Sequence, residues 1–229
     1  TLDGTLFPYT TLFRSSFDWA EWLAPRVEAE AGVRGPLVIT PAQGWLVAID
    51  TQGDVPLKLS DAEMRVQARF PGTLFLVKEQ PAAASPPVSL MAWCRSVVVD
   101  GKTDGTISRG IPVGPRSSGG VTRPALFAHP PPNGRTTLHL PMLLPAQPVR
   151  FHGHVGIADG SKSKGIIFIV EINGVPIARE NMLPGGWREI SCDLRRWAGK
   201  IAVLSLVTDS DGAYDFDWAL WGEPEITSF

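Results

Sequence analysis

The sequence has few of the residues that build disulfide scaffolds and metal centres. Its 229 residues include two cysteines, Cys94 and Cys192, and four histidines. Two cysteines are too few for a disulfide framework or a cysteine-rich zinc site. We therefore expect both thiols to be reduced and far apart, and we expect no cofactor.

Long apolar runs and an excess of charge of one sign are missing as well. No stretch of 18 consecutive apolar residues occurs, so we expect no membrane insertion by this fragment. The formal net charge of −2 gives no electrostatic reason to expect a nucleic-acid partner.

Signatures of catalysis are also absent. The chain contains no G-x-S-x-G, no H-E-x-x-H, no Walker loop and no G-x-G-x-x-G after a strand. Nothing singles out a pair of acids for glycoside hydrolysis, and no local pattern joins Cys94 to a histidine. The sequence predicts that the chain is not an enzyme.

Glycine and proline are abundant instead, at 23 and 21 residues, so turns are frequent and long helices few. Runs rich in Val, Ile, Leu and Phe lie between the turns, which is typical of strands, and Asn173-Gly174 is a strong hairpin signal. Seven or eight such strands with little helix predict an all-β fold, an antiparallel β-sandwich. Its strands are predicted at residues 90–99, 136–140, 149–157, 166–172, 187–192, 201–208 and 214–221.

The region before residue 85 is expected to be a smaller β-rich N-terminal segment. Residues 81–87, Pro-Ala-Ala-Ala-Ser-Pro-Pro, are typical of a linker. We therefore predict a segment at 28–84 followed by a β-sandwich module at 85–229, with long loops over residues 100–125. The strands of the segment are predicted at 36–40, 45–50, 64–70 and 73–78.

The first fifteen residues are interpreted as a non-native artefact. Residues 5–15 resemble the conceptual translation of a sequencing adapter, so residues 1–15 are left out of the fold prediction. The true N-terminus is then missing, and the sequence says nothing about a signal peptide.

One short motif occurs twice. Residues 17–27 and 216–226 share the pattern Phe-Asp-Trp-Ala-x-Trp-x-x-Pro. Because tryptophan is rare, this recurrence predicts a tandem array of related domains. On this interpretation residues 16–27 are the last strand of a preceding copy whose body is missing.

The last hundred residues resemble the NPCBM family, a family of carbohydrate-binding modules appended to bacterial glycoside hydrolases. The resemblance covers residues 125–227 and rests on three motifs in order: His129, Phe151, Gly156 and Asp159; then Phe168, Val170, Asn173 and Gly174; then Asp217, Ala219 and Trp221. Residues 193–200 are also similar to an edge found in many jelly-roll binding modules. The resemblance implies a jelly-roll sandwich that binds glycan, in an extracellular, periplasmic or cell-surface location.

Tryptophans are the candidate ligand-binding residues. A Trp on a rigid sheet offers a flat apolar surface that matches the C–H face of a sugar ring. Trp187 follows Pro184-Gly185-Gly186 and is expected to be the most exposed, with Trp93 second. The tryptophans of the repeated motif are expected in the core: Trp19, Trp22, Trp218 and Trp221.

Two clusters resemble metal sites, and for both we favour a structural role. His152 and His154 share one face of a strand, with His139 as a conceivable third ligand, but hydrogen-bonded surface residues are the simpler interpretation. Four aspartates carry the oxygen ligands that Ca²⁺ prefers, but their spacing is not that of an EF-hand. They are Asp209, Asp211, Asp215 and Asp217. We expect weak calcium binding or none.

The sequence thus favours a non-catalytic ligand-binding module of a bacterial tandem-array protein, with glycan and neighbouring modules as partners. One alternative is a structural or protein–protein spacer of a large envelope or surface protein. The other is an accessory module of a carbohydrate-active enzyme whose catalytic part is missing.

Overall fold

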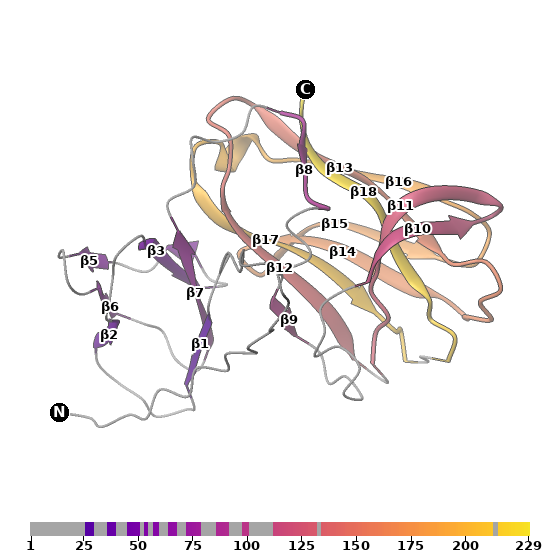
Figure 1. Ribbon diagram of the computed structural model, residues 1–229, viewed down its shortest axis with the longest axis horizontal. Helices are drawn as coiled ribbons and strands as arrows, with labels where there is room; N and C mark the ends of the chain where they lie inside the picture. The colour runs from indigo at the N-terminus through magenta and orange to yellow at the C-terminus, as the bar shows by residue number, and fades with distance from the viewer. Residues whose placement is uncertain are drawn as a thin grey trace, which may run out of the picture.

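In the computed structural model, two antiparallel sheets face each other and form a β-sandwich (Figure 1). The structure describes residues 86–91, 112–131, 134–212 and 215–229. Outside these ranges it gives only the bounds and pairing of strands. The first sheet has the order β10-β11-β18-β13-β16, with β8 also paired to β18. The second sheet has the order β15-β14-β17-β12-β9.

The strands of the sandwich alternate with tight turns and short loops. Their bounds are β8 Val88–Ser89, β9 Val98–Asp100, β10 Val113–Ser118, β11 Val121–Phe127, β12 Arg135–Leu143, β13 Val149–Ile157, β14 Ile166–Ile172, β15 Val175–Met182, β16 Arg188–Asp193, β17 Ile201–Asp209 and β18 Ala219–Ser228. A 3₁₀ turn, η3 (Arg195–Trp197), precedes β17 and packs Trp197 against the core.

The pairing of strands β11 to β18 is that of a long hairpin rolled up on itself. β14 and β15 form the innermost hairpin around Asn173-Gly174, β13 pairs with β16, β12 with β17, and β11 with β18. On either side of that hairpin, consecutive strands alternate between the two sheets. This arrangement of eight strands is a jelly roll, and it confirms the predicted fold.

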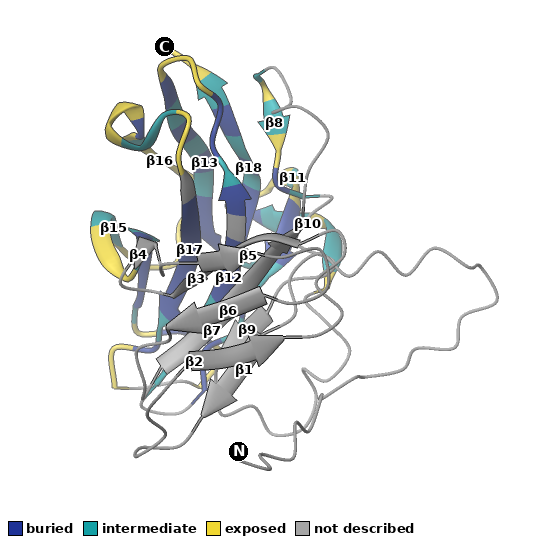
Figure 2. Ribbon diagram, turned by 90° about the vertical axis from the view of Figure 1, so that its left-hand side faces the viewer, coloured by how far each residue is buried: buried dark blue, intermediate teal, exposed yellow. Residues whose placement is uncertain are grey.

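The core lies between the sheets and is built by period-two alternation. Along β13, Val149, Phe151 and Val155 are buried against the second sheet, while polar residues take the positions between them. Trp221 on β18 fills the centre, with its ring 5.3 Å from that of Phe168 in a nearly perpendicular contact. Its Nε1 donates a hydrogen bond of 3.2 Å to Thr208 Oγ1 on the second sheet. Figure 2 shows the dark blue, buried segments running along the sandwich strands.

Several predicted elements are confirmed and others are wrong. β13 and β14 have the predicted bounds. Within the stretch predicted as loops, residues 113–125 lie in a β10–β11 hairpin instead, while residues 101–111 lie outside the described residues. Pro115 and Pro124 of this hairpin lie opposite each other at the sheet edge, where a missing N–H is tolerated. The last strand begins at Ala219 rather than residue 214 and runs to Ser228.

In the N-terminal part, the structure gives the bounds and pairing of seven strands. They are β1 Arg26–Ala29, β2 Pro36–Ile39, β3 Trp45–Asp50, β4 Gly53–Asp54, β5 Leu57–Leu59, β6 Met64–Gln67 and β7 Gly72–Lys78. They pair in the orders β1-β7-β3-β4 and β2-β6-β5. The predictions on residues 1–15, on most of 16–27, and on Trp93 and Cys94 lie outside the described residues. No helix among the described residues is long and apolar enough to cross a membrane.

Candidate functional site

The Trp187 indole rests on two glycines of the first sheet, on the face turned away from the core (called here the outer face). A Cβ atom on Gly222 would lie 2.8 Å from Cζ3 of Trp187, and one on Gly156 would lie 2.9 Å from its Cε3. The ring can therefore occupy this position only because both residues lack a side chain. Trp187 Nε1 also donates a hydrogen bond of 2.7 Å to the carbonyl of Val121 on β11. The ring is thus held in place before any ligand arrives.

Trp187 is less exposed than the sequence predicts. The prediction assumed that a Trp after two glycines points into solvent, whereas this side chain is half-buried. Burial arises from Gly156 and Gly222, which are distant in sequence and open a seat for the ring. The second predicted ligand residue, Trp93, lies outside the described residues.

The β10–β11 turn that supplies the Val121 carbonyl is itself fastened to β13. The Asp159 carboxylate accepts hydrogen bonds from the N–H groups of Gly119 at 2.7 Å and Gly120 at 3.0 Å. A Cβ on Gly119 would lie 2.7 Å from the Cα of Gly186, so the turn also packs directly on the backbone before Trp187. These contacts fix the hairpin, and with it the acceptor of the indole N–H.

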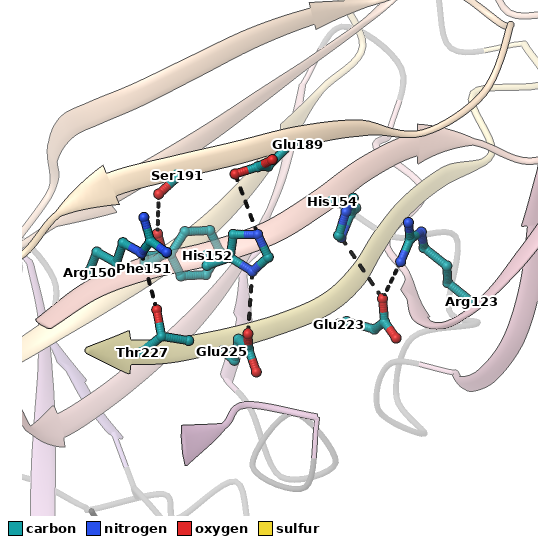
Figure 3. Close-up of polar contacts among 10 residues, drawn as sticks. All are labelled: Arg123, Arg150, Phe151, His152, His154, Glu189, Ser191, Glu223, Glu225 and Thr227. Carbon is teal, nitrogen blue, oxygen red and sulfur yellow. Dashed lines mark hydrogen bonds and ion pairs between the residues drawn. The ribbon is translucent and has the colours of Figure 1, made fainter. Parts of the chain in front are cut away.

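A row of polar side chains lies on the same outer face (Figure 3). The strand register pairs one of its members, His154, with Gly222 beneath Trp187. His152 lies between two carboxylates: its Nδ1 is 3.3 Å from Oε1 of Glu225, and its Nε2 is 3.5 Å from Oε1 of Glu189. The strand register places these three residues on β13, β18 and β16. The members of the polar row are Arg123, Arg150, His152, His154, Glu189, Ser191, Glu223, Glu225 and Thr227.

The end of the polar row nearest Trp187 is an ion pair beside a second histidine. Arg123 Nη1 donates a hydrogen bond of 2.6 Å to Glu223 Oε2, and His154 Nδ1 lies 3.9 Å from the same oxygen. Burial lowers the pKa of His154, and the charge of Arg123 lowers it further. These effects favour the neutral form of the His154 ring. Its ring meets that of His152 edge-on, with centroids 5.5 Å apart.

A β-bulge in β18 aims Glu223 into this group. His152 pairs with Glu225 and His154 with Gly222, so Glu223 and Pro224 together face the single residue Gly153. Glu223 has a φ of 46°, a conformation outside the ordinary strand region. A bulge redirects a side chain and accommodates a proline in an inner strand.

His152 has a hydrogen-bonding contact of the kind expected from the sequence, with Glu225 at 3.3 Å, whereas Nδ1 of His154 is buried without a hydrogen-bond partner among the described residues. His139 lies on β12 in the second sheet, where its Nδ1 is 3.0 Å from Ser205 Oγ, so it cannot complete a metal site with His152 and His154. This His–Ser pair resembles part of a catalytic dyad, but His139 is 7% exposed and Ser205 is 1% exposed. Such burial leaves no access for a substrate.

The four aspartates considered as a calcium site do not converge on one point, because two of them are engaged by other side chains. Asp209 forms an ion pair of 2.7 Å with Arg135, Asp217 is buried and accepts a hydrogen bond from Ser163, and Asp211 and Asp215 are exposed. Within the described stretches, no group of three or more His, Cys, Asp or Glu side chains is placed to hold a metal ion.

No family model matches the chain, and no curated protein matches it. Solved structures with similar strand arrangements include TmCBM61 in complex with β-1,4-galactotriose, at 12% identity and a TM-score of 0.42, over 66% of this chain and 100% of that one. The M60 catalytic domain with the CBM51-1 and CBM51-2 domains of Clostridium perfringens ZmpB is 15% identical over 85% of this chain and 23% of that one, with a TM-score of 0.43.

Another similar structure is that of the tandem CBM51 modules of Sp3GH98 from Streptococcus pneumoniae SP3-BS71. It is 12% identical over 77% of this chain and 62% of that one, with a TM-score of 0.39. All three scores are below 0.5, so the fold assignment rests on the strand pairing itself, and the site is interpreted from its own residues.

Proposed function

We propose that this chain is a non-catalytic module that binds carbohydrate on the outer face of its first sheet. The observation that carries the proposal is the Trp187 indole, seated on Gly156 and Gly222 with the polar row on the same face. A flat apolar surface beside hydrogen-bonding groups is the combination that a sugar ring requires, because the ring has apolar C–H faces and a hydroxyl rim.

Most of the affinity is expected to come from the ring contact. Sugars are strongly hydrated, so a hydrogen bond exchanged with water contributes little net free energy. Stacking on an aromatic ring that is already fixed buries apolar surface without ordering a flexible side chain. The Val121 hydrogen bond holds Trp187 in this way.

The polar row supplies direction. His152 offers ring nitrogens, Glu189 offers a carboxylate, and Arg123 offers a guanidinium that is already paired with Glu223. The imidazole can donate or accept a hydrogen bond, the carboxylate accepts, and the guanidinium donates, so each can pair with a sugar hydroxyl. The row therefore selects the orientation of the sugar hydroxyls, while Trp187 anchors the ring.

A screen of plant, microbial and mucin polysaccharides by affinity electrophoresis tests the proposal. Losing an anchor of this kind costs about 2 kcal/mol or more, so Trp187→Ala should weaken binding by at least roughly tenfold. Because the ring is half-buried, this variant will also lose some stability, and its fold is checked by circular dichroism. Retention by no polysaccharide in the screen would favour the spacer alternative.

A matched pair of glycine variants separates the ring position from general destabilisation. Gly222→Ala should push the indole off its seat, since every close contact of the new Cβ is a Trp187 atom, and should weaken binding with Trp187 still present. Gly114→Ala is the control, because a Cβ there meets nothing within 4 Å. Equal affinities for the two variants would contradict the role of the seated ring.

The wider context is part of the same proposal. We infer an NPCBM-like module at residues 85–229, a β-rich segment at 28–84 and a remnant of a preceding copy at 16–27, after an artefact at 1–15. The repeated Phe-Asp-Trp-Ala motif supports a tandem array. Recovery of the upstream reading frame tests this inference: a second module ending in residues 17–27 is expected, and an unrelated upstream sequence would overturn it.

A further inference from the structure

The outer face carries a second aromatic group farther along β18. Trp221 and Ala219 belong to the core, so the alternate residues Gly222, Leu220 and Trp218 are directed to the outer face. The ladder with β13 continues past the start of β18, since Ala158 N donates a hydrogen bond of 2.9 Å to the carbonyl of Trp218. Trp218 therefore lies on the same face as the seat of Trp187.

Phe216 extends this group into solvent. Its side chain is 45% exposed, and its ring centroid is 5.9 Å from that of Trp218. The Nζ of Lys162 lies 5.5 Å from the Phe216 centroid. The ammonium group lies over one face of the Phe216 ring, so the apolar surface open to a sugar is the opposite face, with the tilted Trp218 ring beside it.

The backbone that presents Phe216 is strained. Its φ is 63°, a left-handed conformation that costs a bulky residue free energy. Two hydrogen bonds to its carbonyl oxygen hold it there, one of 2.5 Å from Ser161 Oγ and one of 2.7 Å from the N–H of Trp218. An exposed ring recovers little burial in return, so stability alone does not account for this conformation.

The internal repeat leads to the same residue. Residues 17–20 and 216–219 are both Phe-Asp-Trp-Ala. In the described copy, Ala219 is in the core and Asp217 is a buried acceptor for Ser163, and packing explains both. Phe216 is the repeated residue whose ring is exposed, and packing does not explain why it recurs.

We propose that Phe216 and Trp218 form a second ring-stacking platform, so that the site takes a glycan chain of several sugars rather than one terminal sugar. The inference rests on the proposed function and specifies its ligand class. Trp218 lies one residue before β18 and four residues from Gly222, a separation of about 13 Å along extended backbone. Two platforms at this separation bind successive parts of an extended oligosaccharide.

The test is isothermal titration calorimetry with the β-1,4-linked galactose, xylose, mannose and glucose series, from one to six units. For the series that binds, the wild-type affinity should rise with length until both platforms are spanned. Phe216→Asn removes the ring and tolerates the left-handed backbone. It should leave the affinity for the shortest binding sugar unchanged and lower that for the longest by roughly fivefold.

Two further variants control the experiment. Phe229→Ala also removes an exposed phenylalanine ring, which lies under the guanidinium of Arg195. This variant should bind all lengths as the wild type does. Phe216→Trp keeps a platform and should retain the gain with length.

The outcomes are distinguishable. Equal affinity for all lengths, or an unchanged affinity of Phe216→Asn for the longest oligosaccharide, would overturn the second platform while leaving the Trp187 site in place. Absence of binding at every length, or full binding by Trp187→Ala, would count against the proposed function itself.

Discussion

The hydroxyl of Ser163 donates a hydrogen bond of 2.5 Å to Oδ1 of Asp217, and both side chains are buried. The other oxygen of Asp217, Oδ2, has no hydrogen-bond partner among the described residues. Burial raises the pKa of Asp217, while the Ser163 hydrogen bond and the charge of His129 act in the opposite direction. The folded protein therefore favours the protonated form of this acid more than the unfolded chain does.

This raised pKa predicts how stability changes with pH. The folded state holds the Asp217 proton more tightly than the unfolded chain, so the stabilisation is present at low pH and is lost as the pH rises through the folded-state pKa. Asp217→Asn keeps an acceptor for Ser163 and does not titrate. We expect the Tm of the wild type, minus that of the variant, to be larger at pH 4 than at pH 7 by scanning calorimetry. A difference that does not change with pH would contradict the assignment.

A second prediction concerns Asp159. Asp159→Ala removes the carboxylate that accepts from the N–H groups of Gly119 and Gly120. Because these groups are exposed and water can replace the carboxylate, we expect a loss of about 1 kcal/mol in the free energy of unfolding. The hairpin also carries the acceptor of the Trp187 indole, so exchange of that N–H with solvent should accelerate. Hydrogen exchange followed by NMR measures this, with the signal identified by its loss in Trp187→Phe. Asp215→Ala, at an exposed aspartate, should change neither quantity.

Another prediction contrasts the two tryptophans at the end of the repeated motif. Trp221→Ala opens a cavity beside Phe168 and removes the hydrogen bond to Thr208, so it should cost about 3–5 kcal/mol. Trp218 is half-buried on the outer face, so Trp218→Ala should cost about 1–2 kcal/mol. Urea unfolding measures both. Equal losses would place Trp218 in the core instead.

A fourth prediction concerns Cys192, which is a free thiol. Burial, with a smaller contribution from the charge of Asp193, raises its pKa to about 12. The thiolate is the reactive form, so Cys192 should not react with Ellman's reagent at pH 8 while the protein is folded. The measurement uses a Cys94→Ala variant, with full labelling expected in urea. Rapid labelling of the folded variant would show that the thiol is accessible.

Strands buried on both faces could be predicted from the sequence, while edge strands could not. In β14, Phe168 and Val170 face the core, and Ile167 and Ile169 are buried on the opposite face, which explains the continuous apolar run. The polar, proline-containing β10–β11 hairpin has no such pattern. It is held by contacts of Asp159 and Trp187 with its backbone, which no local pattern reveals.

Of the proposed binding site, the sequence predicted only Trp187. Trp187 could be selected because it follows two glycines, but Gly156 and Gly222 come from strands far from it in the sequence. The register that joins His152 to Glu225 and Glu189 depends on the sheet as a whole, and a shift of one residue would turn each side chain to the other face. One local signal for the bulge did exist: Pro224 lies within the last strand, and an inner strand holds a proline only at a bulge.

The nested pairing of the strands also implies an order of folding. Among the nested pairs of β11 to β18, the innermost pair, β14 and β15, is joined by a two-residue turn. Each pair outside it closes a longer loop, which costs more chain entropy. We therefore expect the sandwich to zip outward from Asn173-Gly174, with β11 and β18 joining last. Pulse-labelling hydrogen exchange during refolding should protect the amides of β14 and β15 before those of β18. The Trp187 seat, which needs Gly222 on β18 and Val121 on β11, would then be completed only in the final step of folding.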